Sequence, residues 1–216
     1  MSSGIKEELV SMGVSQDKIS VIYNPIPAPK NIIQRTGKQN HFIYIGRIDY
    51  DGQKNVSELM RALDKVSNSF TCDLYGSVDT NTKDKLLDLI SNNKKIVDNI
   101  KFHGFFEDIW DQIQKADVLI LTSKYEGFPM VLCESIAHGI SVVAANCPTG
   151  VNDIVNKNNG YLYTPGNLIQ LEKISNAIVN KSIVLPSVKS VNKTINKFNY
   201  KNYVKRIIDD FDNDIK

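Results

Sequence analysis

The stretch VLILTSKYEGFPMVLCE, residues 118–134, contains the pattern that decides the fold class of this 216-residue chain. Its first part, 118–122, is a continuous run of apolar or β-branched residues of strand length, as expected of a strand covered by helices on both faces of a parallel sheet. A short polar turn follows, and Pro129 suits the first position of the apolar helical pattern that comes next. The stretch therefore predicts a buried strand, a tight turn and a helix.

The same alternation of strand and helix repeats along the chain. Strand patterns occupy 42–46, 70–75, 100–103, 118–122, 141–145 and 160–163. Helical patterns occupy 56–66, 83–91, 108–114, 130–138, 152–155 and 168–180. Capping residues support three helix starts: Asn55 with Glu58 three residues later, Thr82, and Asn167. Repeated β-α units joined by short turns predict an α/β fold with a doubly wound parallel sheet of about six strands.

The two ends of the chain differ from this repeat. Residues 1–40 read as a lead-in, with a short amphipathic helix over 3–13 and a β-rich piece that ends in the stiff stretch NPIPAP, 24–29. Residues 41–181 form the predicted α/β domain. Residues 182–216 are a polar, lysine-rich segment with a final helix over 201–211.

Composition narrows the class of protein. Twenty-six basic and 24 acidic residues leave a net charge of only +2, so no global field favours a nucleic-acid partner. The apolar runs are far shorter than the ~20 residues of a membrane span, and no secretory signal pattern is visible. The three cysteines lie in apolar runs without zinc-ligand spacing, which indicates reduced thiols in a cytoplasmic protein.

A first group of candidate site residues follows the strand 42–46. Ligands of an open parallel sheet bind at the carboxyl ends of the strands. Gly46 permits a tight turn there, and Arg47 and Lys54 carry the charges that would hold a pair of phosphates. The alternative is that Arg47 and Lys54 are two solvated loop cations.

A second group surrounds the helix that starts after Gly127. The free N–H groups and positive dipole end of a helix form an anion site. Glu126 lies just before this helix and Glu134 about a turn and a half into it. Carboxylates would repel a phosphate, so hydroxyl pairs of a sugar or ribose are their expected partners. The alternative is that Glu134 complements the helix dipole and Glu126 is a solvated loop residue.

These motifs together resemble the retaining glycosyltransferases of family 4. The stretch 126–134 resembles the E-x7-E motif of that family, and Gly46-Arg47 with Lys54 resembles its diphosphate-binding pair. The strand 140–145 and the loop 146–150 resemble the segment that follows the E-x7-E helix. The resemblance covers about residues 3–180 and implies the C-terminal, Rossmann-like half of a GT-B fold.

Within that family, the chain more narrowly resembles the lipopolysaccharide 1,6-galactosyltransferases of enteric bacteria. The residues that carry this resemblance are 2–6, 42–47, 52–54 and 126–130. It implies a UDP-sugar donor, UDP-galactose, and transfer to a glucose of the lipopolysaccharide core. The same fold with UDP-glucose, UDP-N-acetylglucosamine or a GDP-sugar remains an alternative.

The resemblance also implies a role for each site residue. Arg47, Lys54 and Glu126 would be the catalytic residues: the two cations hold the diphosphate and stabilise the leaving UDP, and Glu126 contacts the donor sugar. Glu134 would accept from the ribose hydroxyls. The remaining donor-binding positions, which include backbone contacts to uracil, sugar and phosphate, are Gly46, Phe105, Phe106, Gly127, Phe128, Pro129, Met130 and Val131.

No cofactor or metal is expected for this chemistry. Asp210-x-Asp212 and Asp212-x-Asp214 match a metal-binding motif of a different glycosyltransferase fold, but they lie in a polar tail without a preceding strand. The three histidines have no partners at metal-ligand spacing, and Trp110 is assigned to a helix core face.

The family resemblance further implies that an acceptor-binding N-terminal half is missing, so that a glycolipid or oligosaccharide acceptor would bind elsewhere and this fragment alone would be inactive or weakly active. Two other classes remain: a nucleotide-binding module without catalysis, and a dinucleotide dehydrogenase, which lacks its G-x-G-x-x-G here.

Contact with the inner membrane is a separate hypothesis. Lysines recur every fourth residue from Lys189 to Lys205, and in one continuous helix they would form a basic stripe facing anionic lipid. The alternative is a solvated helix face, because Asn192, Thr194 and Asn196 are poor helix formers.

Overall fold

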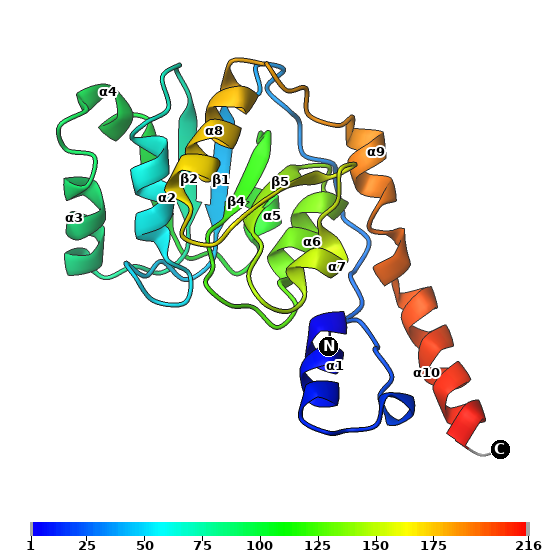
Figure 1. The fold of residues 1–216 in the computed structure, drawn as a ribbon. Coiled ribbons are helices and arrows are strands. Elements are labelled where there is room, and N and C mark those ends of the chain that lie inside the picture. The colour runs from blue at the N-terminus through cyan, green and yellow to red at the C-terminus, as the bar shows by residue number, and fades with distance from the viewer. Residues whose placement is uncertain (1, 215–216) are drawn as a thin grey trace.

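The computed structural model describes residues 2–214 and contains one parallel sheet of six strands (Figure 1). The sheet order is β3-β2-β1-β4-β5-β6. The strands are β1 (His41–Ile45), β2 (Thr71–Tyr75), β3 (Ile100–Gly104), β4 (Val118–Leu121), β5 (Ser141–Ala145) and β6 (Gly160–Tyr163). Every neighbouring pair is parallel, which confirms the predicted doubly wound α/β fold.

Helices cover both faces of the sheet and create two hydrophobic cores. Successive side chains of a strand point to opposite faces, so Phe42 and Tyr44 enter one core while Ile43 enters the other. The first core includes α2 (Val56–Leu63), α3 (Thr80–Asp88) and α8 (Leu168–Val179). The second core includes α6 (Met130–Ala137), α7 (Val151–Ile154) and the later helix α9 (Val188–Lys193), with α5 (Ile109–Gln112) packed on it. A short helix that the sequence did not predict, α4 (Lys94–Val97), precedes β3.

The central pair, β1 and β4, positions the site. From β1 the chain proceeds through β2 and β3 to one edge of the sheet, and from β4 it proceeds through β5 and β6 to the other edge. The connections after β1 and β4 therefore continue to opposite edges of the sheet, the topology at which open α/β sheets form a ligand crevice outside the carboxyl ends of the strands. The predicted site residues 46–54 and 126–134 flank this crevice.

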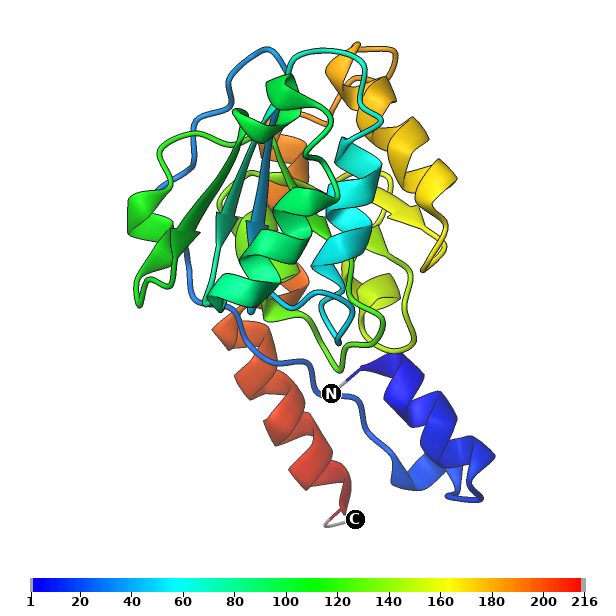
Figure 2. The ribbon, with the colours of Figure 1, turned by 90° about the vertical axis from the view of Figure 1, so that its left-hand side faces the viewer.

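The first and the last described helices lie beside the carboxyl ends of the strands. The chain begins with α1 (Ser3–Ser11) and the single turn η1 (Gln16–Lys18), and it ends with η2 (Asn196–Phe198) and α10 (Tyr200–Asp214). Figures 1 and 2 show α1 and α10 projecting beyond the carboxyl ends of the strands. The predicted β-rich piece of the lead-in is wrong: the segment is extended, and in the described residues it pairs as β-structure only at the isolated bridges Ile26↔Asn199 and Gln34↔Lys115.

Two of the three predicted caps differ from the structure. Asp79, not Thr82, caps α3, because its carboxylate accepts from the Thr82 N–H at 2.9 Å. Asn55 occupies the cap position of α2 in a left-handed conformation, with φ 50°, but its side chain donates to Glu58 and accepts from no backbone N–H of the helix. The Asn167 cap of α8 is confirmed, since its side chain accepts from the Gln170 N–H.

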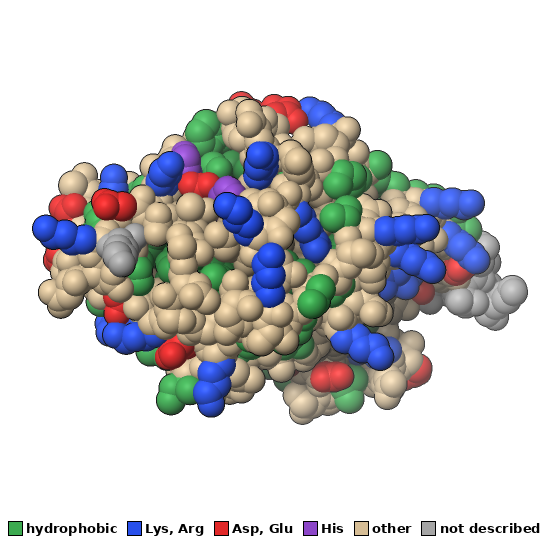
Figure 3. Space-filling view, turned by 90° about the horizontal axis from the view of Figure 1, so that it is seen from above, with side chains coloured by type: hydrophobic (Ala, Val, Ile, Leu, Met, Phe, Trp, Pro, Cys, Tyr) green, Lys and Arg blue, Asp and Glu red, His purple; other side chains and the backbone are tan. Residues whose placement is uncertain are grey.

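The lysine-rich segment does not form one helix. The five lysines are distributed over α9, η2 and α10, so the basic stripe that one continuous helix would create is broken. Lys197 donates to the backbone oxygen of Asp153 at 2.5 Å. At the amino-end edge of the sheet, Lys and Arg side chains are spread across the face rather than gathered into one patch (Figure 3).

Within residues 2–214, no helix is both long enough and apolar enough to cross a membrane. The described residues also hold no cluster of three or more potential metal ligands. The side chains of Asp212 and Asp214, from the acidic tail motif, lie outside the described part of the chain.

Candidate functional site

The loop after β1, residues 46–55, forms a turn that is closed by its own hydrogen bonds, the hook. The buried Tyr44 donates its hydroxyl to the Arg47 carbonyl at 2.7 Å and so supports the turn at Gly46 from below. The Asp49 carboxylate accepts from the backbone N–H groups of Lys54 and Asn55 at 3.0 and 2.9 Å, which closes the hook. The hydrogen bonds fix the backbone of both predicted phosphate-binding residues, Arg47 and Lys54, before any ligand arrives.

This hook is joined to the loop after β4. The Thr122 hydroxyl donates to the Lys54 carbonyl at 2.9 Å, and the Lys124 N–H donates to the Gln53 carbonyl at 2.8 Å. Gln53 Nε2 donates to the Tyr125 carbonyl at 3.1 Å. The two loops on either side of the crevice therefore form one unit.

The side chains of Lys54 and Glu126 meet at the centre of this unit. Lys54 Nζ lies 2.7 Å from Glu126 Oε1, and the two side chains are only 20% and 8% exposed. Thr149 donates its hydroxyl to the Glu126 carbonyl, which anchors the glutamate from a third loop. The sequence assigned Lys54 to a phosphate and Glu126 to a sugar; in the structure without ligand each is the partner of the other.

Arg47 lies on the rim of an adjoining cavity. Its side chain is 64% exposed, and Nη2 lies 3.9 Å from Asp49, so the guanidinium is free to turn toward an anion. The cavity has a volume of about 370 Å³ and crosses the ends of β1, β2 and β3, where Gly46, Phe105 and Phe106 also line it. The structure thus brings Arg47 together with the loop predicted to meet a nucleobase.

The start of α6 faces the same crevice. Pro129 occupies the cap position rather than the predicted first helical position, and no described side chain caps the helix. Gly150 packs so closely that a Cβ there would lie 2.5 Å from the Gly127 carbonyl oxygen. The backbone from Gly127 to Val131 is therefore held with a helix N-terminus toward the crevice, a suitable arrangement for an anion.

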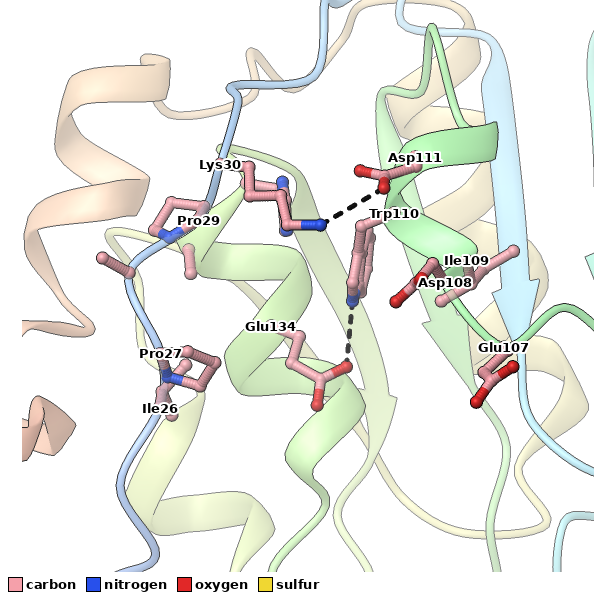
Figure 4. Close-up of a pocket in the computed structure, with 13 residues that line it drawn as sticks. Ile26, Pro27, Pro29, Lys30, Glu107, Asp108, Ile109, Trp110, Asp111 and Glu134 are labelled. Atoms are coloured by element: carbon pink, nitrogen blue, oxygen red, sulfur yellow. Dashed lines mark hydrogen bonds and ion pairs between the residues drawn. The ribbon is translucent and has the colours of Figure 1, made fainter.

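Glu134 lines a second cavity and has a partner that the sequence did not reveal. The cavity, of about 340 Å³, lies between the lead-in, α5 and α6 (Figure 4). Trp110 donates its indole N–H to Glu134 Oε2 at 3.0 Å and stacks on His138, with ring centroids 4.5 Å apart. The two cavities share Glu107 and Ile109, so they are neighbours. Trp110, assigned to a core face from sequence, is a half-buried residue of this region.

The cysteines take no part in the site. All three are buried free thiols. Burial raises the pKa of the Cys147 thiol to about 11 and raises the pKa of the Cys72 and Cys133 thiols as well. A protonated, inaccessible thiol is a poor nucleophile, so cysteine chemistry does not explain this crevice.

Comparison with known families agrees with this geometry. The family described as glycosyl transferases group 1 matches residues 27–198, which include the sheet and the whole crevice. The chain belongs to the group 1 glycosyltransferases.

Its relatives include enzymes that act on lipopolysaccharide. The lipopolysaccharide 1,6-galactosyltransferase of Escherichia coli is 31% identical over 96% of this chain and 58% of its own length. The enzyme of the same name from Salmonella typhimurium is 32% identical over 77% of the chain and 47% of its length. The chain thus spans about half the length of the curated relatives it matches.

Solved structures share the fold. A lipopolysaccharide outer core galactosyltransferase in its apo form superposes with a TM-score of 0.86 and 29% identity, over 95% of this chain and 58% of that one. Anabaena HepE, solved in complex with UDP, superposes with a TM-score of 0.78 and 21% identity, over 98% and 62% of the respective chains. At that lower identity the likeness concerns the fold alone.

Proposed function

We propose that this group 1 glycosyltransferase chain binds the donor of a retaining transfer reaction, and that the donor is a UDP-sugar, specifically UDP-galactose. The observation that carries the proposal is the buried Lys54–Glu126 pair, held by two loops at the crevice between β1 and β4. A cation and a hydroxyl-accepting carboxylate in contact match a ligand in which a phosphate and a sugar are adjacent. The galactosyltransferase relatives support the choice of sugar.

The proposed chemistry depends on charge placement. Lys54, Arg47 and the start of α6 hold the diphosphate and stabilise the negative charge that develops on the leaving UDP. Glu126 accepts from the donor sugar and Glu134 from the ribose. The acceptor hydroxyl attacks from the face that UDP leaves, and a donor phosphate oxygen takes its proton. No side-chain nucleophile and no metal enter this scheme.

A ligand panel tests the proposal. We expect UDP to raise the thermal unfolding midpoint of the chain, and GDP, ADP and NAD to leave it almost unchanged, because ligands stabilise the state that they bind. UDP-galactose is expected to stabilise more than UDP-glucose or UDP-N-acetylglucosamine. A response to GDP or NAD alone would instead support the GDP-sugar or dehydrogenase alternative.

Replacing Arg47 with alanine is expected to weaken UDP binding about tenfold or more. A hydrogen bond to a charged group contributes roughly 1.5–3 kcal/mol, and the exposed guanidinium of Arg47 stands at the rim of the cavity. Calorimetry with and without EDTA measures both the affinity and the need for metal. Arg61→Ala removes the same charge from α2 and should leave the affinity unchanged. Unchanged binding by Arg47→Ala, or its loss with EDTA, would contradict the scheme.

Transfer by this chain alone is expected to be slow. Positioning an acceptor against the donor accounts for roughly 7–11 kcal/mol of a barrier, and the curated relatives contain much additional chain. We expect UDP release from UDP-galactose to be weak and independent of added acceptor glycolipid. Acceptor-dependent turnover close to that of a full-length relative would disprove this expectation.

We further propose that this protein acts on a glycolipid or oligosaccharide acceptor at the cytoplasmic face of the inner membrane. The support is that two of its relatives are named as enzymes of lipopolysaccharide. Co-sedimentation with anionic liposomes at low and physiological salt tests the membrane contact, and the absence of binding at both salt concentrations would reject it.

A further inference from the structure

The hydrogen bond that the structure defines for the Glu134 carboxylate involves one of its two oxygens. Trp110 Nε1 donates to Oε2 at 3.0 Å, a normal length for an N–H···O hydrogen bond. Figure 4 shows the other carboxylate oxygen directed away from the indole, toward the open space between the lead-in and Glu107. The indole thus fixes one side of the carboxylate and leaves the other side available.

The indole itself is held in place from behind. Its ring stacks on the His138 ring with an interplanar angle of 16°, and His138, the C-cap residue of α6, follows Glu134 by one helical turn. His138 Nδ1 donates to the Asn31 carbonyl at 2.8 Å, which fixes the imidazole against the lead-in. Burial lowers the pKa of His138, so the ring is uncharged at neutral pH and brings no positive charge to this side of Glu134.

We propose that Trp110 is a positioning residue that orients Glu134 to accept from a vicinal pair of hydroxyls, the ribose hydroxyls of the donor nucleotide. This inference rests on the proposed function, since it requires a nucleoside beside Glu134. Indole N–H is a neutral donor, so it fixes the carboxylate without cancelling the charge that makes the carboxylate a strong acceptor. A lysine or arginine in this place would neutralise that charge.

The proposal predicts a change in ribose discrimination. Calorimetry would compare UDP with 2′-deoxy-UDP, which lacks one of the two hydroxyls. We expect Trp110→Phe, which keeps an aromatic ring on His138 but loses the N–H, to weaken UDP binding about five- to tenfold. The affinity for 2′-deoxy-UDP should change by less than about twofold, so most of the preference for UDP disappears. Glu134→Gln should have the same effect, and the double variant should lose little more, because residues in one hydrogen-bonded unit are not additive.

His138→Phe is the matched control. It preserves a ring against Trp110 and leaves the indole N–H in place, so the preference for UDP over 2′-deoxy-UDP should persist. Equal losses for both nucleotides in Trp110→Phe would show that Trp110 only packs α5 against α6, and would overturn the inference. A preference that survives unchanged in Trp110→Phe would overturn it as well.

A second measurement needs no variant of Trp110. The chain has one tryptophan, so tryptophan fluorescence reports the surroundings of Trp110, which include this contact. We expect UDP to change the emission of the unaltered chain more than 2′-deoxy-UDP does at saturation, and Glu134→Gln to reduce that difference. Equal responses to the two nucleotides would overturn the inference while leaving UDP binding intact. Failure of the unaltered chain to bind either nucleotide would instead refute the proposed function, and the inference with it.

Discussion

Replacing Lys54 with methionine is expected to weaken UDP binding by about 100-fold, more than the loss of Arg47. Methionine preserves most of the volume of the lysine stem but removes the charge. The lost contact to phosphate is worth roughly 1.5–3 kcal/mol, or about tenfold to more than 100-fold in affinity. The substitution also leaves the Glu126 carboxylate, 8% exposed, without its cation beside the diphosphate. Repulsion by that carboxylate adds to the loss, and calorimetry measures the sum.

The double variant Lys54→Met/Glu126→Gln separates the two effects. Removal of the carboxylate charge should restore part of the UDP affinity, because no unpaired anion then faces the diphosphate. Glu126→Gln alone should retain or improve UDP binding but reduce the added affinity for UDP-galactose over UDP, since the sugar loses its charged acceptor. Lys65→Met is a suitable control, because Lys65 also pairs with a neighbouring carboxylate but is 63% exposed and remote from the crevice. Full UDP affinity in Lys54→Met would remove Lys54 from the proposed site.

The sheet could be predicted closely from sequence because its strands are buried on both faces. Runs such as 118–121 and 141–145 consist almost wholly of apolar residues, and no helical periodicity competes with them. The ends of the chain were predicted less well. Their structure depends on single contacts, such as the Ile26 N–H to the Phe198 carbonyl, between residues far apart in the sequence. Local sequence patterns do not predict contacts between residues so far apart in the chain.

The site, like the fold, could be predicted from the sequence only in part. Gly46, Arg47, Glu126 and Glu134 could be placed at one edge of the sheet, because each follows the end of a predicted strand. Their partners could not be predicted. Trp110 precedes Glu134 by 24 residues and meets it only because α5 and α6 lie on the same face of the sheet. The role of Asp49 could not be predicted either. In sequence, a carboxylate that accepts from backbone N–H groups of its own loop cannot be distinguished from a solvated loop residue.

Gly76 is the glycine at which we expect an added methyl group to lower the stability of the fold most. It directly follows β2, and its N–H donates to the Gly104 carbonyl at 2.8 Å. A Cβ on Gly76 would lie 1.8 Å from the Gly46 carbonyl oxygen, far inside contact distance, and φ there is 153°. The overlap is with backbone, not with a flexible side chain. The turns after β1 and β2 must therefore separate if Gly76 is replaced.

Gly76→Ala should accordingly lower the free energy of unfolding by about 3 kcal/mol or more, at the upper end of overpacking effects, and lower the unfolding midpoint by roughly 6–12 °C. UDP binding should fall with it, because Gly46 and Arg47 move when the turn shifts. Gly104→Ala isolates the cause. Gly104 has a positive φ of 80° at the end of the neighbouring strand, but a Cβ there meets nothing within 4 Å. That variant carries only the backbone strain of about 1–2 kcal/mol. Equal stability of the two variants in denaturant titrations would mean that close approach to Gly46 is not what requires a glycine at position 76.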